Sequence, residues 1–148
     1  MGKRRHAREL ALQGLFYSEN SQRGDPESLD LFIEHYVAPE QPPDFFLKVY
    51  NGVKEHGARI DRLIEANSTN WKLYRMSAVD RNVMRIAVFE FLFCEDIPEK
   101  VSLNEAIDIG KKYGTEESGS FINGILDSIR LHMKKKRESG GAGADDAA

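Results

Sequence analysis

The sequence lacks several features that mark exported, disulfide-rich or membrane-spanning proteins. Its one cysteine, Cys94, stands in an apolar run with no second cysteine to pair with, so we expect a buried free thiol in a reducing compartment. No run approaches the roughly 18 uninterrupted apolar residues of a membrane span. The basic N-terminus leads into charged and apolar residues at helical spacing, not into the unbroken apolar core of a signal peptide. We therefore expect a soluble, cytoplasmic protein without a membrane partner.

Metal-binding and nucleotide-binding patterns are also missing. The histidines are scattered along the chain without partners at metal-ligand spacing: His6, His35, His56 and His132. Residues 110–114 and 114–119 resemble phosphate loops, but neither segment follows a strand, and Ser120 stands where a P-loop needs its lysine. We expect neither a metal nor another cofactor.

Carboxylates are plentiful, yet no pair of them is marked out for acid–base catalysis. The ones that stand out are Asp80, Glu90, Glu105 and Asp108. Helix caps, exposed faces or ion pairs with Arg81, Arg85 or Lys112 explain each of them. We therefore expect no catalytic residue.

The chain has the size of one domain. Its 148 residues, 41% of them hydrophobic, can build one core of ordinary size, which we place in residues 1–137. Residues 138–148 are small and polar and are expected to be a disordered tail. The formal net charge of −3 excludes an overall cationic field, so a nucleic-acid partner would need a local basic patch.

Apolar residues recur at three- and four-residue spacing, and no alternating run indicates a strand, so we predict an all-α bundle of six or seven helices. Capping residues, proline and glycine set the helix limits. The first predicted helix spans residues 3–18, the second is opened by Asp25 and Pro26 and ended by residues 39–43, and the third is capped by Asp44 and runs past Ile64 despite Gly52 and Gly57, which mark close packing or bends. A central fourth helix is capped by Ser77 and ends near Glu95. The fifth is opened by the capping box Ser102–Glu105 and ended by Gly114, and the last is capped by Thr115.

Five basic residues crowd the first turns of the first helix: Lys3, Arg4, Arg5, His6 and Arg8. This is the unfavourable end for cations, because the helix macrodipole is positive there. One interpretation is that these side chains neutralise nucleic-acid phosphates. The other is a solvated helix terminus, and the charge run alone does not choose between them.

Four aromatic residues lie where single-stranded bases could stack on them. Phe16 and Tyr17 follow the basic residues on the same helix, and Tyr113 and Phe121 flank the turn at 114–119. Judged from the residues alone, core packing is the favoured interpretation of all four rings.

Four segments carry a resemblance to a known family: residues 4–13, 79–87, 98–106 and 121–127. In order and spacing they resemble the motifs of the NusB family of bacterial transcription antitermination factors. The resemblance implies a helical fold of two packed subdomains. It further implies that the chain binds boxA single-stranded RNA together with the small-subunit ribosomal protein NusE, and that this complex keeps the RNA polymerase elongation complex from terminating on ribosomal RNA operons.

The resemblance also implies roles for individual residues. The basic start, with Lys3, matches the family's arginine-rich segment at Arg4, Arg5 and Arg8, while His6 stands where relatives commonly have another basic residue. Phe16, Tyr113 and Phe121 become candidate base-contacting rings. Asp80 and Glu117 become candidates to accept hydrogen bonds from base edges or to order the turn beside the RNA.

Two other functions stay open at this point. NusB-like domains also precede ribosomal RNA cytosine methyltransferases, so a role in ribosomal RNA maturation or ribosome assembly is one alternative, although the chain lacks the βαβ pattern of a methyl-donor site. The second is a protein-interaction module without RNA binding, whose acidic region around Glu95, Asp96 and Glu99 would meet a partner. A monomer and a homodimer are both compatible with the sequence.

Overall fold

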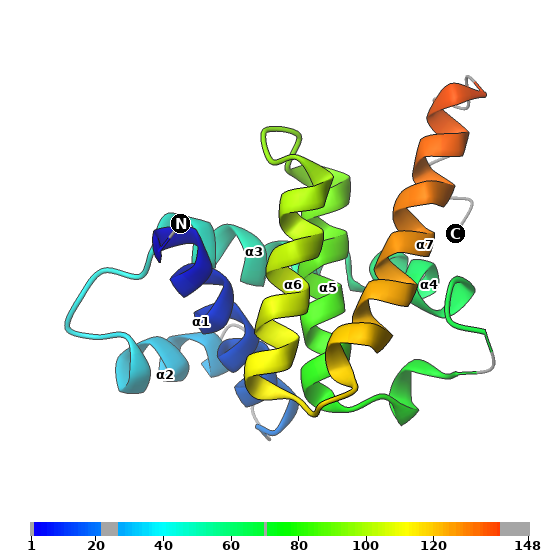
Figure 1. Cartoon of the computed structure of the whole chain (residues 1–148). Helices are drawn as coiled ribbons and strands as arrows, with labels where there is room; N and C mark the ends of the chain where they lie inside the picture. Colours follow the sequence, from blue (N-terminus) through cyan, green and yellow to red (C-terminus); the bar gives the residue numbers. More distant parts are fainter. Residues whose placement is uncertain (1, 22–26, 70, 140–148) are drawn as a thin grey trace.

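The computed structural model describes residues 2–21, 27–69 and 71–139, and within these ranges the chain forms seven α-helices, one short 3-10 helix and no strand (Figure 1). The elements are α1 (Gly2–Glu19), α2 (Glu27–Tyr36), α3 (Asp44–Glu55), α4 (Gly57–Ala66), η1 (Leu73–Arg75), α5 (Ala78–Phe93), α6 (Glu99–Tyr113) and α7 (Ser118–Glu138). The prediction of an all-α fold is confirmed. Of the predicted boundaries, Asp25 and Pro26 lie outside the described residues.

Helix α5 is the central helix, as its nearly continuous apolar sequence predicts. It packs against α1, α3, α4, α6 and α7. Ser77 caps it as expected, because its hydroxyl accepts a hydrogen bond of 3.1 Å from the backbone N–H of Asp80. Helices α1, α2 and α3 lie on one side of α5, whereas α6 and α7 form an antiparallel pair and α4 lies on the far side (Figure 1). This arrangement gives the two packed subdomains.

The predicted long third helix is two helices, α3 and α4. The chain turns at His56, where φ is −106° and ψ is 21°. Gly52 marks close packing, since a Cβ there would overlap the ring of Phe89 on α5. The expected cap at Asp44 is wrong, because Asp44 is the first residue of α3 and Pro43 occupies the N-cap without a side-chain hydrogen bond.

The predicted start of α6 is also wrong. The helix begins at Glu99, directly after Pro98, so Ser102 lies inside the helix and is buried. Its hydroxyl donates a hydrogen bond of 2.6 Å to Oε1 of Glu90 instead of capping a helix. The capping-box pattern Ser-x-x-Glu therefore serves a tertiary contact here.

The turn between α6 and α7 has the expected place and a different local structure. Gly114 ends α6 as predicted, with φ at −102°, and a Cβ there would lie 2.7 Å from the carbonyl oxygen of Gly110. Thr115 is not the cap of α7, which begins at Ser118; the Thr115 hydroxyl accepts a hydrogen bond from the N–H of Glu117 in the preceding turn. Glycine is thus needed at position 114 for space.

The far end of α7 reaches into the segment expected to be a tail. The helix continues through Glu138, and residues 140–148 lie outside the described part of the chain. No helix in the described ranges is both long enough and apolar enough to cross a membrane.

Candidate nucleic-acid interface

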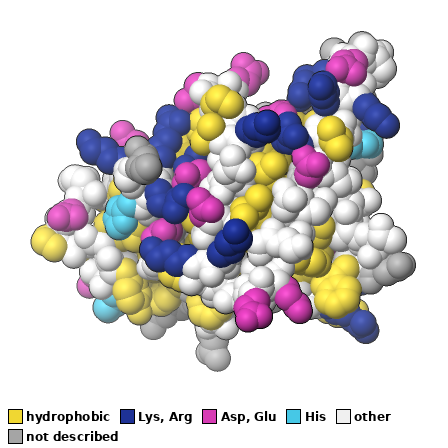
Figure 2. All heavy atoms as spheres, viewed as in Figure 1, with side chains coloured by type: hydrophobic (Ala, Val, Ile, Leu, Met, Phe, Trp, Pro, Cys, Tyr) yellow, Lys and Arg dark blue, Asp and Glu magenta, His cyan; other side chains and the backbone are white. Residues whose placement is uncertain are grey.

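The basic residues at the start of α1 divide into an exposed set and one buried member. Lys3, Arg4 and His6 are exposed, Arg5 is half-buried, and Arg8 is buried. Figure 2 shows Lys and Arg side chains gathered over α1 and the adjoining face of α6, interleaved with Asp and Glu side chains. The local basic patch that the low net charge requires is therefore present, but it is not purely cationic. We call Lys3, Arg4, Arg5 and His6 the basic arm.

Arg4 is held at the surface by one carboxylate and one ring. Its Nη2 donates to Oδ2 of Asp96 at 3.2 Å, and its guanidinium carbon lies 4.8 Å from the centroid of the Phe45 ring on α3. The hydrogen bond from Arg4 lowers the pKa of Asp96 below its ordinary value. Both charged side chains remain largely open to solvent.

Arg5 is bound more tightly, by two carboxylates of α6. Its guanidinium donates through Nε and Nη2 to the two oxygens of Glu105, and Nη2 also donates to Oδ2 of Asp108 at 3.0 Å. The hydrogen bond from Arg5 lowers the pKa of Glu105, and the same contact raises the pKa of Arg5. The unfavourable position of these cations in α1 is thus offset by acidic residues of a neighbouring helix.

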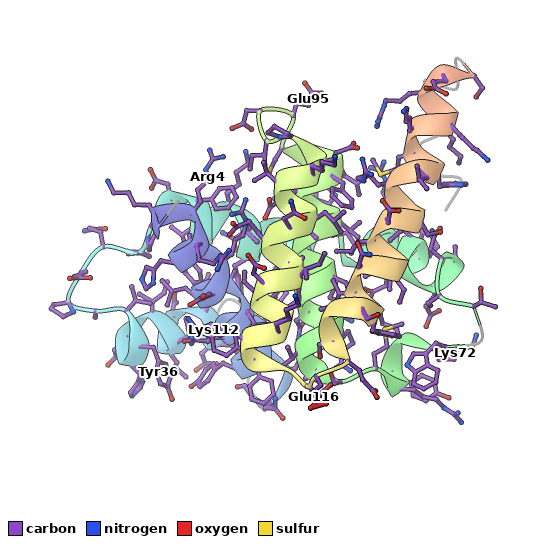
Figure 3. All side chains as sticks on the ribbon, in the orientation of Figure 1. Arg4, Tyr36, Lys72, Glu95, Lys112 and Glu116 are labelled. Carbon is purple, nitrogen blue, oxygen red and sulfur yellow. The ribbon has the colours of Figure 1, made fainter. Side chains whose placement is uncertain are left out.

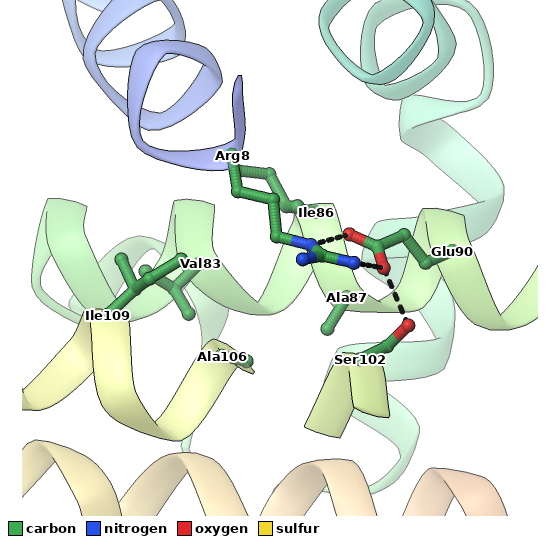
Figure 4. A pocket seen from close by; sticks show the side chains of 8 residues that line it. All are labelled: Arg8, Val83, Ile86, Ala87, Glu90, Ser102, Ala106 and Ile109. Atoms are coloured by element: carbon green, nitrogen blue, oxygen red, sulfur yellow. Dashed lines mark hydrogen bonds and ion pairs between the residues drawn. The ribbon is translucent and has the colours of Figure 1, made fainter. Parts of the chain in front are cut away.

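Arg8 points into the protein and joins three helices (Figure 4). Its Nε and Nη2 donate to the two oxygens of Glu90 on α5 at 2.7 and 2.8 Å, and Ser102 of α6 donates to the same carboxylate. Glu105 accepts a further bond of 3.3 Å from Nη1 of Arg8. In this structure the Arg8 guanidinium is occupied by buried partners, so its structural role differs from that of the exposed arm.

These contacts correct the expected ion pairs. Glu90, Glu105 and Asp108 pair with arginines of α1, not with Arg81, Arg85 or Lys112. Those three cations instead contact Glu19, Asp61 and Glu9. The sequence did not reveal these ion pairs between helices, because the expected pairs joined residues that are close together along the chain. The available signal was Glu90 itself, an acidic residue in an otherwise apolar run that needs a buried cation.

An apolar groove of about 590 Å³ lies between the last turns of α1, helix α2, the start of α5 and the end of α6. Phe16 and Tyr113, two of the candidate base-contacting rings, both line it, with side chains that are 50% and 38% exposed. Core packing, which the residues alone favour, therefore does not account for these two rings. Tyr17 is half-buried and packs on Phe32 at 5.9 Å between ring centroids.

Tyr36 is a groove residue that the sequence did not single out. Its ring is 61% exposed and stacks on Phe32 at 5.2 Å between centroids, with an interplanar angle of 29°. The signal was a tyrosine at the end of a short amphipathic helix, on the same side as the buried Phe32. Figure 3 places Tyr36 and Lys112 toward the opposite end of this face from Arg4.

Lys112 and Glu9 connect the basic arm to the groove. Glu9 accepts bonds of 3.1 and 3.2 Å from Nζ of Lys112 and one of 2.9 Å from the hydroxyl of Tyr113. The bond with Glu9 raises the pKa of Lys112 above its ordinary value. Because Glu9 holds both groups, it fixes the Tyr113 ring at the edge of the groove.

The remaining candidate residues lie around the α6–α7 turn and the start of α5. Phe121 is half-buried and meets the exposed Trp71 edge to face, at 6.2 Å between centroids. Glu117 is exposed at the N-cap of α7. Oδ1 of Asp80 is buried, and no described residue offers it a hydrogen bond. The structure thus pairs Phe16 with Tyr113 in one groove, whereas Phe121 has Trp71 as its aromatic neighbour.

No group of three or more histidine, cysteine, aspartate or glutamate side chains in the described ranges is placed to hold a metal ion. Cys94 is buried, and burial raises the pKa of its thiol.

Comparison with known proteins assigns this architecture to a family. Residues 5–130 match the model of the NusB family, which is most of the chain. The chain belongs to the NusB family. The NusB segments that the sequence shares lie in α1, at the start of α5, in the first turns of α6 and in α7, so they contain Arg4, Arg5 and His6 of the basic arm together with Arg8, Ser102 and Glu105, whereas Glu90 follows the second segment.

Full-length relatives support the same assignment. The transcription antitermination protein NusB of Desulfatibacillum aliphaticivorans is 59% identical over 139 residues, covering 94% of this chain and 97% of the relative. Among solved structures, NusB of T. maritima is 40% identical, with a TM-score of 0.77 and coverage of 91% of this chain and 96% of that one. A crystal structure of the antitermination factors NusB and NusE in complex with dsRNA contains a chain of 25% identity and TM-score 0.78, covering 89% of this chain and 98% of that one.

Proposed function

We propose that this NusB-family chain is a transcription antitermination factor without a catalytic centre of its own. In the cytoplasm it binds boxA-type single-stranded RNA together with the NusE ribosomal protein, and it supports the RNA polymerase elongation complex on ribosomal RNA operons. The observation that carries the proposal is the likeness of nearly the whole chain to a fold solved as NusB with NusE and dsRNA. The relative from Desulfatibacillum aliphaticivorans, which carries the antitermination name, matches over 97% of its length.

The distribution of chemistry over one face supports RNA as the ligand. The basic arm can supply phosphate contacts, which give affinity without sequence information. The groove with Phe16, Tyr113 and Tyr36 offers ring faces on which unpaired bases stack. Figure 3 shows Lys112 between Arg4 of the basic arm and Tyr36 of the groove, so its ammonium group can contact the backbone of the strand. Cations and exposed rings in this order are typical of single-strand binding surfaces.

Asp80, Glu117 and Phe121 complete the proposed RNA surface beside the α6–α7 turn. Asp80 enters the proposal through the family resemblance, as an acceptor for a donor on a base edge, although its Oδ1 is buried in this structure and is not itself open to the RNA. Phe121 and Trp71 offer a second pair of rings. Arg8 acts in this proposal through the fold: it ties α1 to α5 and α6 and thereby positions Arg4 and Arg5.

The test is binding of a labelled boxA strand and a scrambled strand at two salt concentrations, with and without NusE. The protein variants are Arg4→Ala/Arg5→Ala and a control, Lys134→Ala/Lys135→Ala, which removes two exposed cations from the end of α7. Arg8 stays unchanged because it is buried.

We expect NusE to tighten binding of the boxA strand selectively. The arm variant should weaken both strands and flatten the salt dependence by about 0.7 for each phosphate that the arm no longer neutralises, and the α7 variant should leave both nearly unchanged. If the chain binds NusE but neither strand under any condition, RNA binding is wrong and the chain is a protein-interaction module. Equal weakening by the two variants would show that the arm has no special place in binding.

A further inference from the structure

The guanidinium groups of Arg4 and Arg5 are already paired with carboxylates of the protein itself. Asp108 lies 3.0 Å from Nη2 of Arg5, and Asp96 lies 3.2 Å from Nη2 of Arg4. The two aspartate side chains are 55% and 62% exposed, so both contacts lie at the surface that RNA would approach. At each arginine, an aspartate oxygen thus accepts the hydrogen bond that a phosphate oxygen of the RNA would accept.

The carboxylates around the arm fall into two groups: an inner tier, Glu105, and an outer tier, Asp96 and Asp108. Glu105 is only 21% exposed, binds Arg5 through both of its oxygens and reaches Arg8 as well. Its removal would leave Arg5 without its anchor. Asp96 and Asp108 each make one contact with the arm, and isolated surface pairs of this kind contribute little to stability. Glu105, the inner tier, therefore holds Arg5 and Arg8 in place, whereas Asp96 and Asp108, the outer tier, can be exchanged for another anion.

We propose that Asp96 and Asp108 are built-in competitors of RNA phosphate, which prevent the basic arm from holding RNA by charge alone. This inference rests on the proposed RNA-binding function. A strand that offers only phosphates exchanges one anion for another at Arg4 and Arg5 and gains little. A strand whose bases also enter the groove at Phe16 and Tyr113 has a further source of affinity, so base contacts decide whether it stays bound.

The competition has a distinct salt signature. Cations condensed on the RNA are released only where an arginine neutralises a phosphate, so an arginine that keeps its aspartate adds nothing to the salt dependence of binding, which is then shallower than the number of arginines suggests. Without the aspartate, the same arginine neutralises a phosphate and those cations are released. Removing the outer tier should therefore steepen the salt dependence while it tightens binding.

The experiment measures binding of the boxA and scrambled strands to Asp108→Asn, Asp96→Asn and the double variant at several salt concentrations. The matched control is Asp127→Asn, which also removes one negative charge and one Asp–Arg pair, of 2.9 Å to Arg130, but on α7, on the other side of α6 from α1. Urea unfolding of each variant checks that the fold is retained.

We expect the double variant to bind both strands about three- to tenfold more tightly at low salt, with a salt slope steeper by about 0.7 for each arginine freed. The control should stay within a factor of about two of the wild type. Unchanged binding in the double variant, or equal tightening in the control, would overturn the proposal, and weaker binding would show that the aspartates orient the arm.

The same data separate this inference from the function on which it rests. If the wild type binds boxA selectively with NusE and the aspartate variants match it, only the competition is wrong. If neither the wild type nor any variant binds RNA, the proposed function fails and the competition fails with it.

Discussion

The guanidinium of Arg8 donates two buried hydrogen bonds, of 2.7 and 2.8 Å, to the carboxylate of Glu90, although the two residues are 82 positions apart in the sequence. Both side chains are nearly inaccessible, at 4% and 1% exposed. A void of about 10 Å³ beside them, lined by apolar residues of α5 and α6, is barely large enough for a water molecule (Figure 4). Each charge therefore depends on the other, and the pair fixes the start of α1 against the centre of the bundle.

Arg8→Ala should destabilise the protein by about 3–5 kcal/mol, because it leaves the Glu90 carboxylate buried without a counter-charge. Urea unfolding measures the change. The double variant Arg8→Met/Glu90→Met should recover most of this stability, since neither charge remains buried. Arg4→Ala, which breaks only an exposed pair, should cost less than about 1 kcal/mol. Equal destabilisation by the two single variants would contradict the buried role of Arg8.

Gly52→Ala should destabilise the contact between α3 and α5. The new methyl group would overlap Cε1 and Cζ of the buried Phe89, so the helices must separate or the ring must leave its place. Overpacking of this kind costs about 1–3 kcal/mol. Gly124→Ala is the control, because nothing lies within 4 Å of a Cβ there, and it should be neutral or stabilising. Thermal unfolding of the two variants distinguishes these outcomes.

Stability should decrease in acid in a way that depends on Glu19. Burial opposes ionisation of this carboxyl, but hydrogen bonds from Arg81, Arg85 and Asn82 outweigh it and lower its pKa below the ordinary value of 4.5. A folded-state pKa below the unfolded one stabilises the protein fully above pH 4.5, and this contribution is lost as the pH falls through the folded value.

The measurement is the free energy of unfolding in urea as a function of pH. Glu19→Gln should be less stable than the wild type at neutral pH, with the difference shrinking below pH 4.5. Glu116→Gln, in the exposed turn before α7, serves as the control and should follow the wild type. A constant difference between Glu19→Gln and the wild type at all pH values would show that the carboxylate does not contribute through its charge.

Phe16→Ala and Tyr113→Ala should each weaken binding of the boxA strand, because stacking of one base on one ring contributes about 1–3 kcal/mol. Both rings line the groove at its open side, so stability should change little. The control is Tyr74→Ala, which truncates a ring that is 74% exposed on η1, outside the groove. Fluorescence anisotropy of a labelled strand gives the affinities. Weaker RNA binding in the control alone would move the base-contacting surface away from the groove.

Several elements were predictable from local sequence because their causes are local. The cap of α5 at Ser77, the end of α6 at Gly114 and the burial of the apolar run in α5 all follow from residues within a few positions. The wrong predictions concern residues whose local sequence pattern is compatible with more than one structure. Ser102 and Glu105 fit a capping box, but both lie inside α6, where they serve Glu90 and Arg5 instead. The break at His56 was marked by Gly57 without being assigned.

The make-up of the candidate RNA surface could be predicted in part. Charge, aromatic character and resemblance predict the basic arm and the rings Phe16, Tyr113 and Phe121, and their contact with RNA stays a prediction. Tyr36 was missed, because its exposure depends on how α2 packs against α1. Arg8 was grouped with the exposed cations, since a run of basic residues does not show which of them faces the core.

The sequence by itself determined the helical class, several helix ends and the membership of a family, since apolar periodicity, capping residues and motifs act over short distances along the chain. Only the tertiary structure decided which charges meet. Arg8 and Glu90, or Arg5 and Asp108, lie far apart in sequence, and their pairing depends on the packing of α1 against α5 and α6. That packing turns a row of similar cations into one buried anchor and an exposed, partly neutralised arm.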